Sequence, residues 1–278
     1  MTPLRRRMIE DMRLHALKEA TQRAYVDAVA NLARYFKRSP DQVTEEELRR
    51  FFVSLTRRRA KSTVRVHLFA IRFLYRYTLR RPSATLDLIR VKRDKKLPAV
   101  LSHDEVRQLL AHIRRPEART AALLMYSCGL RVSQAIHLKI ADVDSRRMVL
   151  CVRHGKAGQQ QYVPLPQRTL ELLRAYWRER HPAHWLLPDH SGTRPIRREA
   201  VLKAIVPAAH EARLTKHVSC HTLRHSYATG LLEDGMDIRL IQGLLGHHSI
   251  RSTVGYAHLT SGTLKNVQAL INKRMADL

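Results

Sequence analysis

The chain has 278 residues, 44% of them hydrophobic, so it can bury a sizeable core and does not have the composition of a disordered protein. Its 51 lysines and arginines against 24 acidic residues give a net charge of +27, which favours a polyanionic partner, nucleic acid before an anionic membrane. No apolar run approaches the roughly 18 residues of a membrane-spanning helix, and the basic start lacks the apolar segment of a secretion signal. Three cysteines without C-x-x-C spacing suit a reducing compartment, so we expect a cytoplasmic protein.

The first third of the chain has the apolar spacing of helices packed in a small bundle. Between residues 17 and 36, apolar side chains recur at three- and four-residue steps. Thr44 and Glu47 form a capping box that predicts a second helix, and the Ser-Thr pair at 62–63 is expected to cap a third. Four or so helices suit a helical domain over residues 1–95.

Arginines and lysines recur along all of these predicted helices. Any single one is best interpreted as part of a solvated face, but as a set with few acids nearby they indicate a phosphate-binding surface. Aromatic residues such as Tyr35, Phe69 and Tyr77 fall at core spacing, so we interpret them as packing residues rather than base-stacking ones. The basic residues are those at positions 5–7, 34, 37, 57–59, 61, 65, 72, 76, 80 and 81.

Residues 89–99 are a linker by their charge density and by Pro98. Such a segment is polar because it is solvated, and it could also lie along a nucleic-acid backbone; both interpretations stay open. The capping box of Ser102 and Glu105 then begins the first helix of a second domain, residues 98–278.

The second domain is expected to be mainly helical with one small antiparallel sheet. Two arms rich in branched and aromatic residues, 148–153 and 159–164, flank a glycine-containing turn and predict a β-hairpin. Lys156 lies between two glycines of that turn, where a lysine is normally a solvated surface residue. Helices are expected over residues 103–113, 120–128, 165–180, 197–213 and 262–276.

A short motif after the second of these helices contains an arginine suited to phosphate. Gly129 is expected to end the helix, and Leu130-Arg131-Val-Ser133-Gln134 then opens a short one. A guanidinium beside the free N–H groups of a helix N-terminus can hold a phosphate. A lone arginine is more often a surface or ion-paired residue, so the motif gains weight only from the rest of the chain.

Residues 219–260 carry imidazoles, a guanidinium and a phenol on an otherwise apolar, helical framework. Gly235 and Gly246 are expected to end short helices, so that residues far apart in sequence can converge. The candidate site residues of this segment are His221, Arg224, His247 and Tyr256.

These motifs resemble those of the tyrosine site-specific recombinases, also called phage-type integrases. The family's C-terminal signature is His-x-x-Arg, Leu-Gly-His, and a tyrosine nine residues after that histidine, which is the spacing from His247 to Tyr256. The Gly-Leu-Arg-x-Ser segment around Arg131 resembles the first arginine motif, and Lys156 occupies the place of the family's hairpin lysine. The resemblance covers nearly the whole chain but departs at Gln134, where most members have a glutamate that supports the arginines.

The resemblance implies an enzyme that cleaves and rejoins DNA through a 3′-phosphotyrosyl intermediate, with no metal ion, cofactor or ATP. Arg131 and Arg224 would clamp the phosphate oxygens, and Lys156 would give a proton to the departing 5′ oxygen. The remaining implied catalytic residues are His221 as base and later acid, His247 as a hydrogen-bond donor to the phosphate, and Tyr256 as the nucleophile.

The resemblance also implies a domain organisation and partners. A helical core-binding domain at 1–95 would grip double-stranded DNA beside an α+β catalytic domain at 98–278, in dimers or tetramers on the DNA. The terminal helix 262–276 could pack on its own domain, although we expect it to dock into a neighbouring protomer. The biological role would be integration of a bacterial mobile element, or resolution of replicon dimers.

Other chemistries fit these residues less well. His221 and His225 could share a helix face as metal ligands, but neither a carboxylate pair nor a cysteine pair accompanies them. Cys220 is expected to be a small buried residue rather than a thiol nucleophile, and Tyr227, a competing phenol, to lie on an apolar face. A type IB-like topoisomerase and a catalytically silent DNA-binding regulator stay as alternatives.

Overall fold

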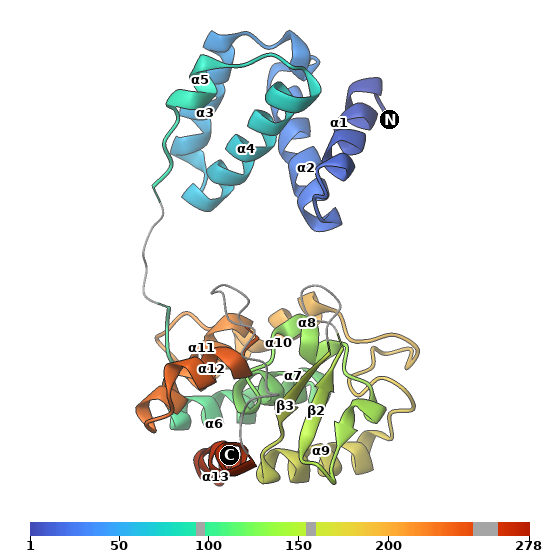
Figure 1. Cartoon of the computed structure of the whole chain (residues 1–278), viewed down its shortest axis with the longest axis vertical. Coiled ribbons are helices and arrows are strands. Elements are labelled where there is room, and N and C mark those ends of the chain that lie inside the picture. Colours follow the sequence, from blue (N-terminus) through green and yellow to red (C-terminus); the bar gives the residue numbers. More distant parts are fainter. Residues whose placement is uncertain (93–97, 154–159, 247–260) are drawn as a thin grey trace. The chain divides into compact units, whose positions relative to one another are not determined.

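The computed structural model describes residues 1–92, 98–153, 160–246 and 261–278, and of 261–265 only the backbone. The chain divides into two compact units, Met1–Lys96 and Leu97–Leu278. Both are mainly helical, and the second also contains a three-stranded antiparallel sheet (Figure 1). The predicted fold class is therefore confirmed. Within the described residues, no helix combines the length and the apolarity that a membrane crossing requires.

The first unit is a helical bundle around one apolar core. Its elements are α1 (Pro3–Leu14), α2 (Glu19–Phe36), η1 (Pro40–Gln42), α3 (Glu45–Arg58), α4 (Lys61–Phe73), the π-helical turn η2 (Leu74–Thr78) and α5 (Ala84–Leu88). The capping box is confirmed, because the Thr44 backbone N–H donates to Glu47 at 2.9 Å. The predicted cap of α4 is wrong: Ala60 occupies the N-cap, so residues 62–63 lie inside the first turn.

Several aromatic residues of this unit lie on its surface, not in its core. Tyr35, Phe69 and Tyr77 are 47%, 45% and 38% exposed, so these three are not core residues, whereas Phe51, Phe52 and Phe73 are buried as predicted. Phe69 instead lies 5.9 Å from the guanidinium of Arg65, and Tyr77 lies 5.5 Å from that of Arg76. Such arginine–aromatic pairs form a cationic surface that is partly apolar.

The second unit surrounds a central apolar helix, α7. Its elements are α6 (His103–His112), α7 (Pro116–Ser127), α8 (Val132–Ile136), η3 (Ile140–Asp142), β1 (Val143–Asp144), β2 (Val149–Val152), β3 (Gln161–Pro164), α9 (Gln167–Arg180), α10 (Arg198–Glu211), α11 (Cys220–Glu233), α12 (Ile238–Leu244) and α13 (Ser261–Met275). Nearly every residue of α7 is buried, and α9, α10 and α11 pack against it. An apolar surface all round a helix is typical of such a central position.

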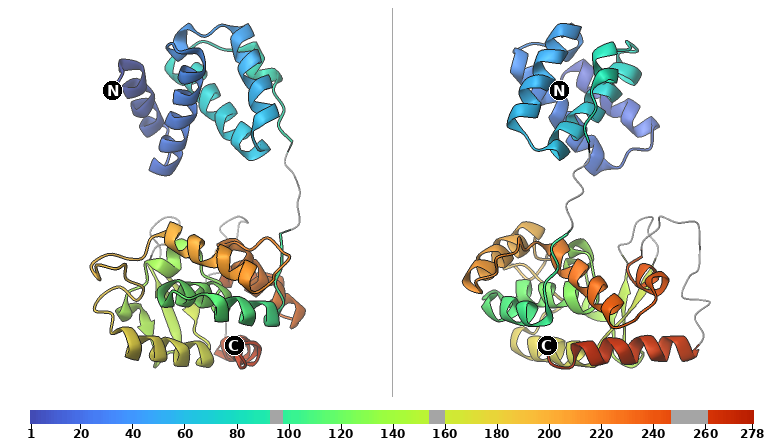
Figure 2. Two further views of the ribbon diagram at one scale, coloured as in Figure 1. Left: turned by 180° about the vertical axis from the view of Figure 1, so that it is seen from behind. Right: turned by 90° about the vertical axis from the view of Figure 1, so that its left-hand side faces the viewer.

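The small sheet extends the predicted hairpin by one strand. Strands β2 and β3 pair antiparallel, with Leu150 opposite Val163, as the sequence predicts for the two arms. The two-residue strand β1 was not predicted; it pairs with the outer edge of β2, so the order is β1-β2-β3. Figure 2 shows the sheet beside the helices of this unit.

Glycines end three helices of the second unit, as predicted. Gly129, Gly235 and Gly246 have φ of +62°, +84° and +59°, the left-handed conformation that closes a helix C-terminus. At Gly129 a second constraint applies, because an added Cβ would lie 2.6 Å from the ring of Tyr227. The chain can therefore turn sharply out of α7 and pass directly beneath α11.

The C-terminal helix α13 packs on its own unit. Ile271 and Met275 are completely buried, and Gln268 donates to the backbone oxygen of Leu165 at 3.0 Å. Arg274 donates to the backbone oxygen of Gly230 at 2.7 Å. These contacts pack α13 on its own unit (Figure 2), and its docking into a neighbouring protomer stays a prediction.

Candidate active site

Arg131 stands at the N-terminus of α8, where its backbone is fixed by Gln134. Its N–H donates to Oε1 of Gln134 at 2.8 Å, and Gln134 is only 4% exposed. This contact requires an acceptor but no charge, so the glutamine meets it without burying an ionised carboxylate. The departure from the family's glutamate therefore preserves the support of the Arg131 backbone and brings no negative charge to this buried position.

Arg224 is buried on α11, with 7% of its surface exposed, and it joins two helix ends. Its Nη1 donates to the backbone oxygen of Gly129, just after α7, at 2.5 Å. Its Nη2 donates to the backbone oxygen of Leu245, just after α12, at 2.6 Å. The rigid fork of a guanidinium can make both bonds at once, whereas the single ammonium of a lysine has no such fixed geometry.

Arg131 reaches the same helix end. Its Nη2 lies 3.5 Å from the backbone oxygen of Gly246, the residue that follows the acceptor of Arg224. Two guanidinium groups from α8 and α11 therefore converge on successive carbonyl groups where α12 ends. The next residue along the chain is His247.

The pair carries uncompensated positive charge. Burial, and next the charge of Arg131, lowers the pKa of Arg224 to about 10, so Arg224 remains protonated at neutral pH. Among the described residues, no ion pair joins either arginine to a carboxylate. Buried like charges without a counter-ion favour binding of an anion, and each guanidinium still has N–H donors beyond those used on carbonyl oxygens.

His221 and His225 lie on the exposed part of α11, one helical turn apart. Burial, together with the charges of His221 and Arg224, lowers the pKa of His225. His225 is therefore biased toward the neutral form mainly by its burial, and less by the neighbouring positive charges. His221, in the first turn of the helix, is open to solvent and accessible to a substrate.

The structure thus brings Arg131 and Arg224 together, and His221 lies one helical turn before Arg224 on α11. Lys156, His247 and Tyr256 lie outside the described residues.

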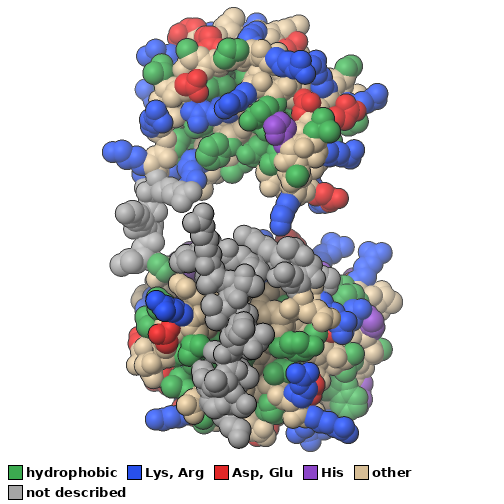
Figure 3. All heavy atoms as spheres, in the orientation of Figure 1, with side chains coloured by type: hydrophobic (Ala, Val, Ile, Leu, Met, Phe, Trp, Pro, Cys, Tyr) green, Lys and Arg blue, Asp and Glu red, His purple; other side chains and the backbone are tan. Residues whose placement is uncertain are grey.

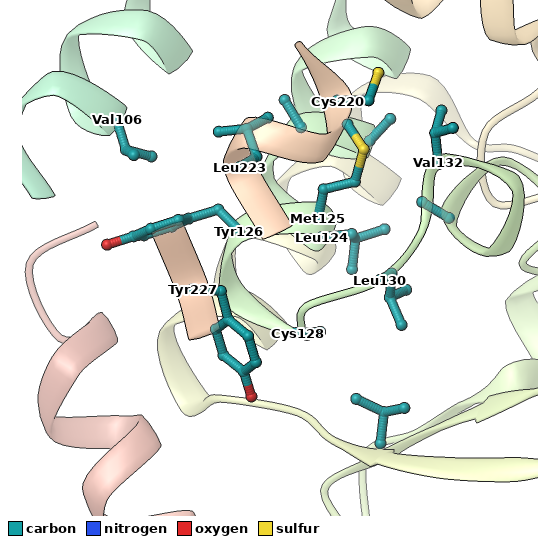
Figure 4. Close-up of a cluster of buried hydrophobic side chains, with 14 of the residues drawn as sticks. Val106, Leu124, Met125, Tyr126, Cys128, Leu130, Val132, Cys220, Leu223 and Tyr227 are labelled. Atoms are coloured by element: carbon teal, nitrogen blue, oxygen red, sulfur yellow. The ribbon is translucent and has the colours of Figure 1, made fainter. Parts of the chain in front are cut away.

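The other phenols of the second unit are unsuited to attack on DNA. Tyr227 and Tyr126 are fully buried, as Figure 4 shows, and Tyr176 is 6% exposed. Tyr162 is exposed, but alternation along β3 directs it to the sheet face opposite its neighbours, and it packs against Arg147, 5.1 Å away. The expected apolar position of Tyr227 is confirmed.

Metal or thiol chemistry finds no support in the described part of the chain. It contains no group of three or more histidine, cysteine or acidic side chains that could hold a metal ion. Cys220 is 4% exposed, and burial raises the pKa of its thiol, which opposes formation of a thiolate nucleophile. Cys220 is a buried small residue, as predicted.

Two contacts of the β2–β3 hairpin were missed from the sequence. Arg153, at the end of β2, donates to the buried carboxylate of Asp142 at 2.6 Å. Gln161, the first residue of β3, donates to the backbone oxygen of Leu244 at 2.8 Å. Both are long-range contacts of ordinary polar residues. No spacing or motif marks them.

Comparison with known proteins decides the family. Residues 99–262 match the phage integrase family, and residues 4–85 match the N-terminal SAM-like domain of phage integrases. The chain belongs to the phage integrase family. It is a site-specific tyrosine recombinase, which cleaves and rejoins DNA, as the sequence predicts.

Relatives within this family cover most of the chain. The chain is 39% identical to "Putative integrase/recombinase y4qK" of Sinorhizobium fredii, over 94% of this chain and 86% of the relative. It is 35% identical to tyrosine recombinase XerD of Staphylococcus saprophyticus, over 74% of this chain and 72% of XerD. A solved structure of a lambda integrase dimer bound to a core site shares the fold, with a TM-score of 0.73 at 18% identity, covering 88% of this chain and 94% of that one.

Proposed function

We propose that Arg131 and Arg224 hold the scissile phosphate of DNA while Tyr256 attacks its phosphorus. Charge builds on the nonbridging oxygens as phosphorus becomes five-coordinate, and two fixed guanidinium groups stabilise that charge. The bond from the Tyr256 oxygen to phosphorus forms as the bond to the 5′ oxygen breaks. The product is a 3′-phosphotyrosyl ester, which conserves the bond energy for rejoining.

Proton transfer falls to the other predicted residues. His221 takes the phenol proton, Lys156 supplies one to the departing 5′ oxygen, and His247 donates a hydrogen bond to the phosphate. In the rejoining step the directions reverse, so His221 returns its proton to Tyr256. The exposure of His221 beside the buried Arg224 suits a base that must meet a substrate from solution.

One observation supports this assignment above the others. The guanidinium groups of Arg131 and Arg224 converge on the backbone oxygens of Gly246 and Leu245, with no carboxylate paired to either among the described residues. A structural ion pair would have a partner of opposite charge. Arg131 and Arg224 instead have no such partner among the described residues, and the carbonyl groups that they contact directly precede His247 in the sequence. Two cations placed in this way are suited to bind a phosphate group.

The same proposal includes the domain roles and the assembly. Residues 1–95 form the core-binding domain and residues 98–278 the catalytic domain. Lys and Arg side chains are spread over the visible face of the first unit (Figure 3), and its arginine–aromatic pairs offer both charge and apolar contact to DNA. The lambda integrase relative is a dimer on its core site, and dimers or tetramers on DNA are proposed here as well.

The proposed biological role is integration or excision of a bacterial mobile element, acting on DNA in the cytoplasm. The relative y4qK bears the name of an integrase or recombinase. Resolution of replicon dimers is the other role that strand exchange of this kind can serve.

A nicked duplex made from the DNA that flanks the gene tests the mechanism. A nick close to the cleavage position lets the short leaving strand diffuse away, so the covalent intermediate accumulates. We expect a protein–DNA adduct that survives denaturant, and none with Tyr256→Phe. Failure of the native chain to form any adduct on such DNA, or an adduct with the phenylalanine variant, would contradict the proposal.

A further inference from the structure

Gln161 holds the end of α12, and no predicted catalytic role accounts for it. The last carbonyl groups of a helix lack partners within the helix. Nε2 of Gln161 donates to the backbone oxygen of Leu244 at 2.8 Å and lies 3.3 Å from that of Gly243. A side chain from the sheet therefore caps the helix end on which both arginines converge.

The same side chain fits closely against Gly246. A Cβ added at Gly246 would lie 2.6 Å from Oε1 of Gln161, and the backbone there has a positive φ. Both the glycine and the glutamine are thus needed for this approach. Together the four carbonyl groups from Gly243 to Gly246 receive donors from three elements, Gln161 of β3, Arg224 of α11 and Arg131 at α8.

The hydrogen bonds of Gln161 to α12 link two parts of the chain that flank predicted site residues. Gln161 begins β3, directly after the hairpin segment that contains Lys156. Gly246, on the other side of the contact, directly precedes His247. One amide therefore connects the start of the strand that follows Lys156 in the sequence with the helix end to which both arginines donate.

We infer that Gln161 is a positioning residue that fixes the Lys156 hairpin relative to the arginine pair. The inference rests on the proposed function, since it takes Lys156 as the acid for the departing 5′ oxygen. A general acid transfers its proton only within hydrogen-bond reach, and a displacement of about 1 Å can cost on the order of 100-fold in rate. Loss of the hydrogen bonds from Gln161 to the end of α12 should impair proton transfer to the 5′ oxygen more than phosphate binding.

Sulfur in place of the bridging 5′ oxygen separates these two effects. A thiolate is a far weaker base than an alkoxide, so it leaves without needing a proton. We therefore compare single-turnover adduct formation on two otherwise identical nicked duplexes, one with the bridging oxygen and one with sulfur. The ratio of the two rates is measured on one protein preparation, so any misfolded fraction cancels.

For Gln161→Ala we expect the rate with oxygen to fall about 10- to 100-fold and the rate with sulfur to fall much less. Lys156→Ala should show the same selectivity. Gln161→Glu, which keeps the length but replaces the donor nitrogen with an acceptor, should behave like the alanine variant. Gln160→Ala is the matched control, because Gln160 is an exposed glutamine directly before β3, and its ratio should equal that of the native chain.

Two results would overturn the inference, and they differ in whether the proposed function also fails. If sulfur rescues Lys156→Ala while Gln161→Ala slows both substrates equally, Gln161 only stabilises the helix end, and the proposed function stands. If sulfur rescues neither variant, the acid role of Lys156 is wrong, and the inference falls with that part of the proposed function.

Discussion

The two units use arginine in opposite ways. In the second unit Arg224 is 7% exposed, and both of its terminal nitrogens are fixed on backbone oxygens of other elements. In the first unit Arg57 and Arg58, in the last turn of α3, are exposed to solvent. The arginine side chain is thus a fixed pair of donors in the second unit and a solvent-exposed charge in the first.

This difference suits the two kinds of phosphate contact that we propose for the two units. A transition state needs donors that are already in place, because reorganisation during the reaction raises the barrier. A DNA backbone needs only positive charge along its path, and release of counter-ions supplies the affinity. Substitutions that keep charge but change geometry should therefore affect the two units very differently.

The largest effect is expected from Arg224→Lys. An ammonium lacks the planar guanidinium geometry that places one N–H group on Gly129 and another on Leu245, so both the link between the two helix ends and the bidentate contact to phosphate should weaken. We expect adduct formation to slow by on the order of 10³-fold, while affinity for DNA falls little. Single-turnover assays beside a binding titration measure both. Near-native cleavage by the lysine variant would mean that charge alone suffices here.

A smaller effect is expected at Gln134. Gln134→Ala removes the acceptor for the Arg131 backbone N–H, and loss of such a cap costs about 1 kcal/mol of unfolding free energy. Chemical denaturation should show that loss, and cleavage should slow about 10-fold because Arg131 is less fixed. Gln134→Glu keeps the acceptor and supplies a counter-charge, so it should retain cleavage and raise the pKa of Arg224. Equal losses in both variants would show that the amide nitrogen, not the acceptor, matters.

The smallest effect is expected from the exposed arginines. Arg57→Lys with Arg58→Lys should leave DNA affinity nearly unchanged, since charge is conserved. Changing both to alanine should weaken binding and reduce the slope of log affinity against log salt by about 1 for each phosphate that the protein no longer neutralises. Titrations at several salt concentrations test this. A lysine pair as weak as the alanine pair would show that these arginines also bind DNA through fixed geometry.

Most local signals in the sequence predicted local structure correctly, although the cap of α4 was placed two or three residues too late. Gly129 and Gly246 end helices, and Ser102 with Glu105 caps α6, because these features depend on only a few neighbouring residues. The exposure of Phe69 could not be predicted in the same way. Its burial depends on which side of α4 faces the bundle, and the apolar spacing there permits more than one answer.

The site residues also differ in whether local sequence or tertiary structure reveals them. The motifs around Arg131 and Arg224 were visible, but their convergence on successive carbonyl groups is a tertiary fact that spacing does not contain. No sequence pattern predicted the role of Gln161, because a glutamine at the start of a strand is common. Its role depends on its hydrogen bond to Leu244 of α12, which only the tertiary structure shows. Strand β1 was missed because two residues are too few to form a pattern.

Strand cleavage as we propose it requires that Tyr256 becomes covalently linked to DNA. The direct measurement is to trap the adduct on a nicked duplex, digest protein and DNA, and locate the attached nucleotide by mass spectrometry. The prediction is a single modified peptide, with the nucleotide's 3′ phosphate on Tyr256. A nucleotide on any other residue, such as His221 or Tyr162, would contradict the account.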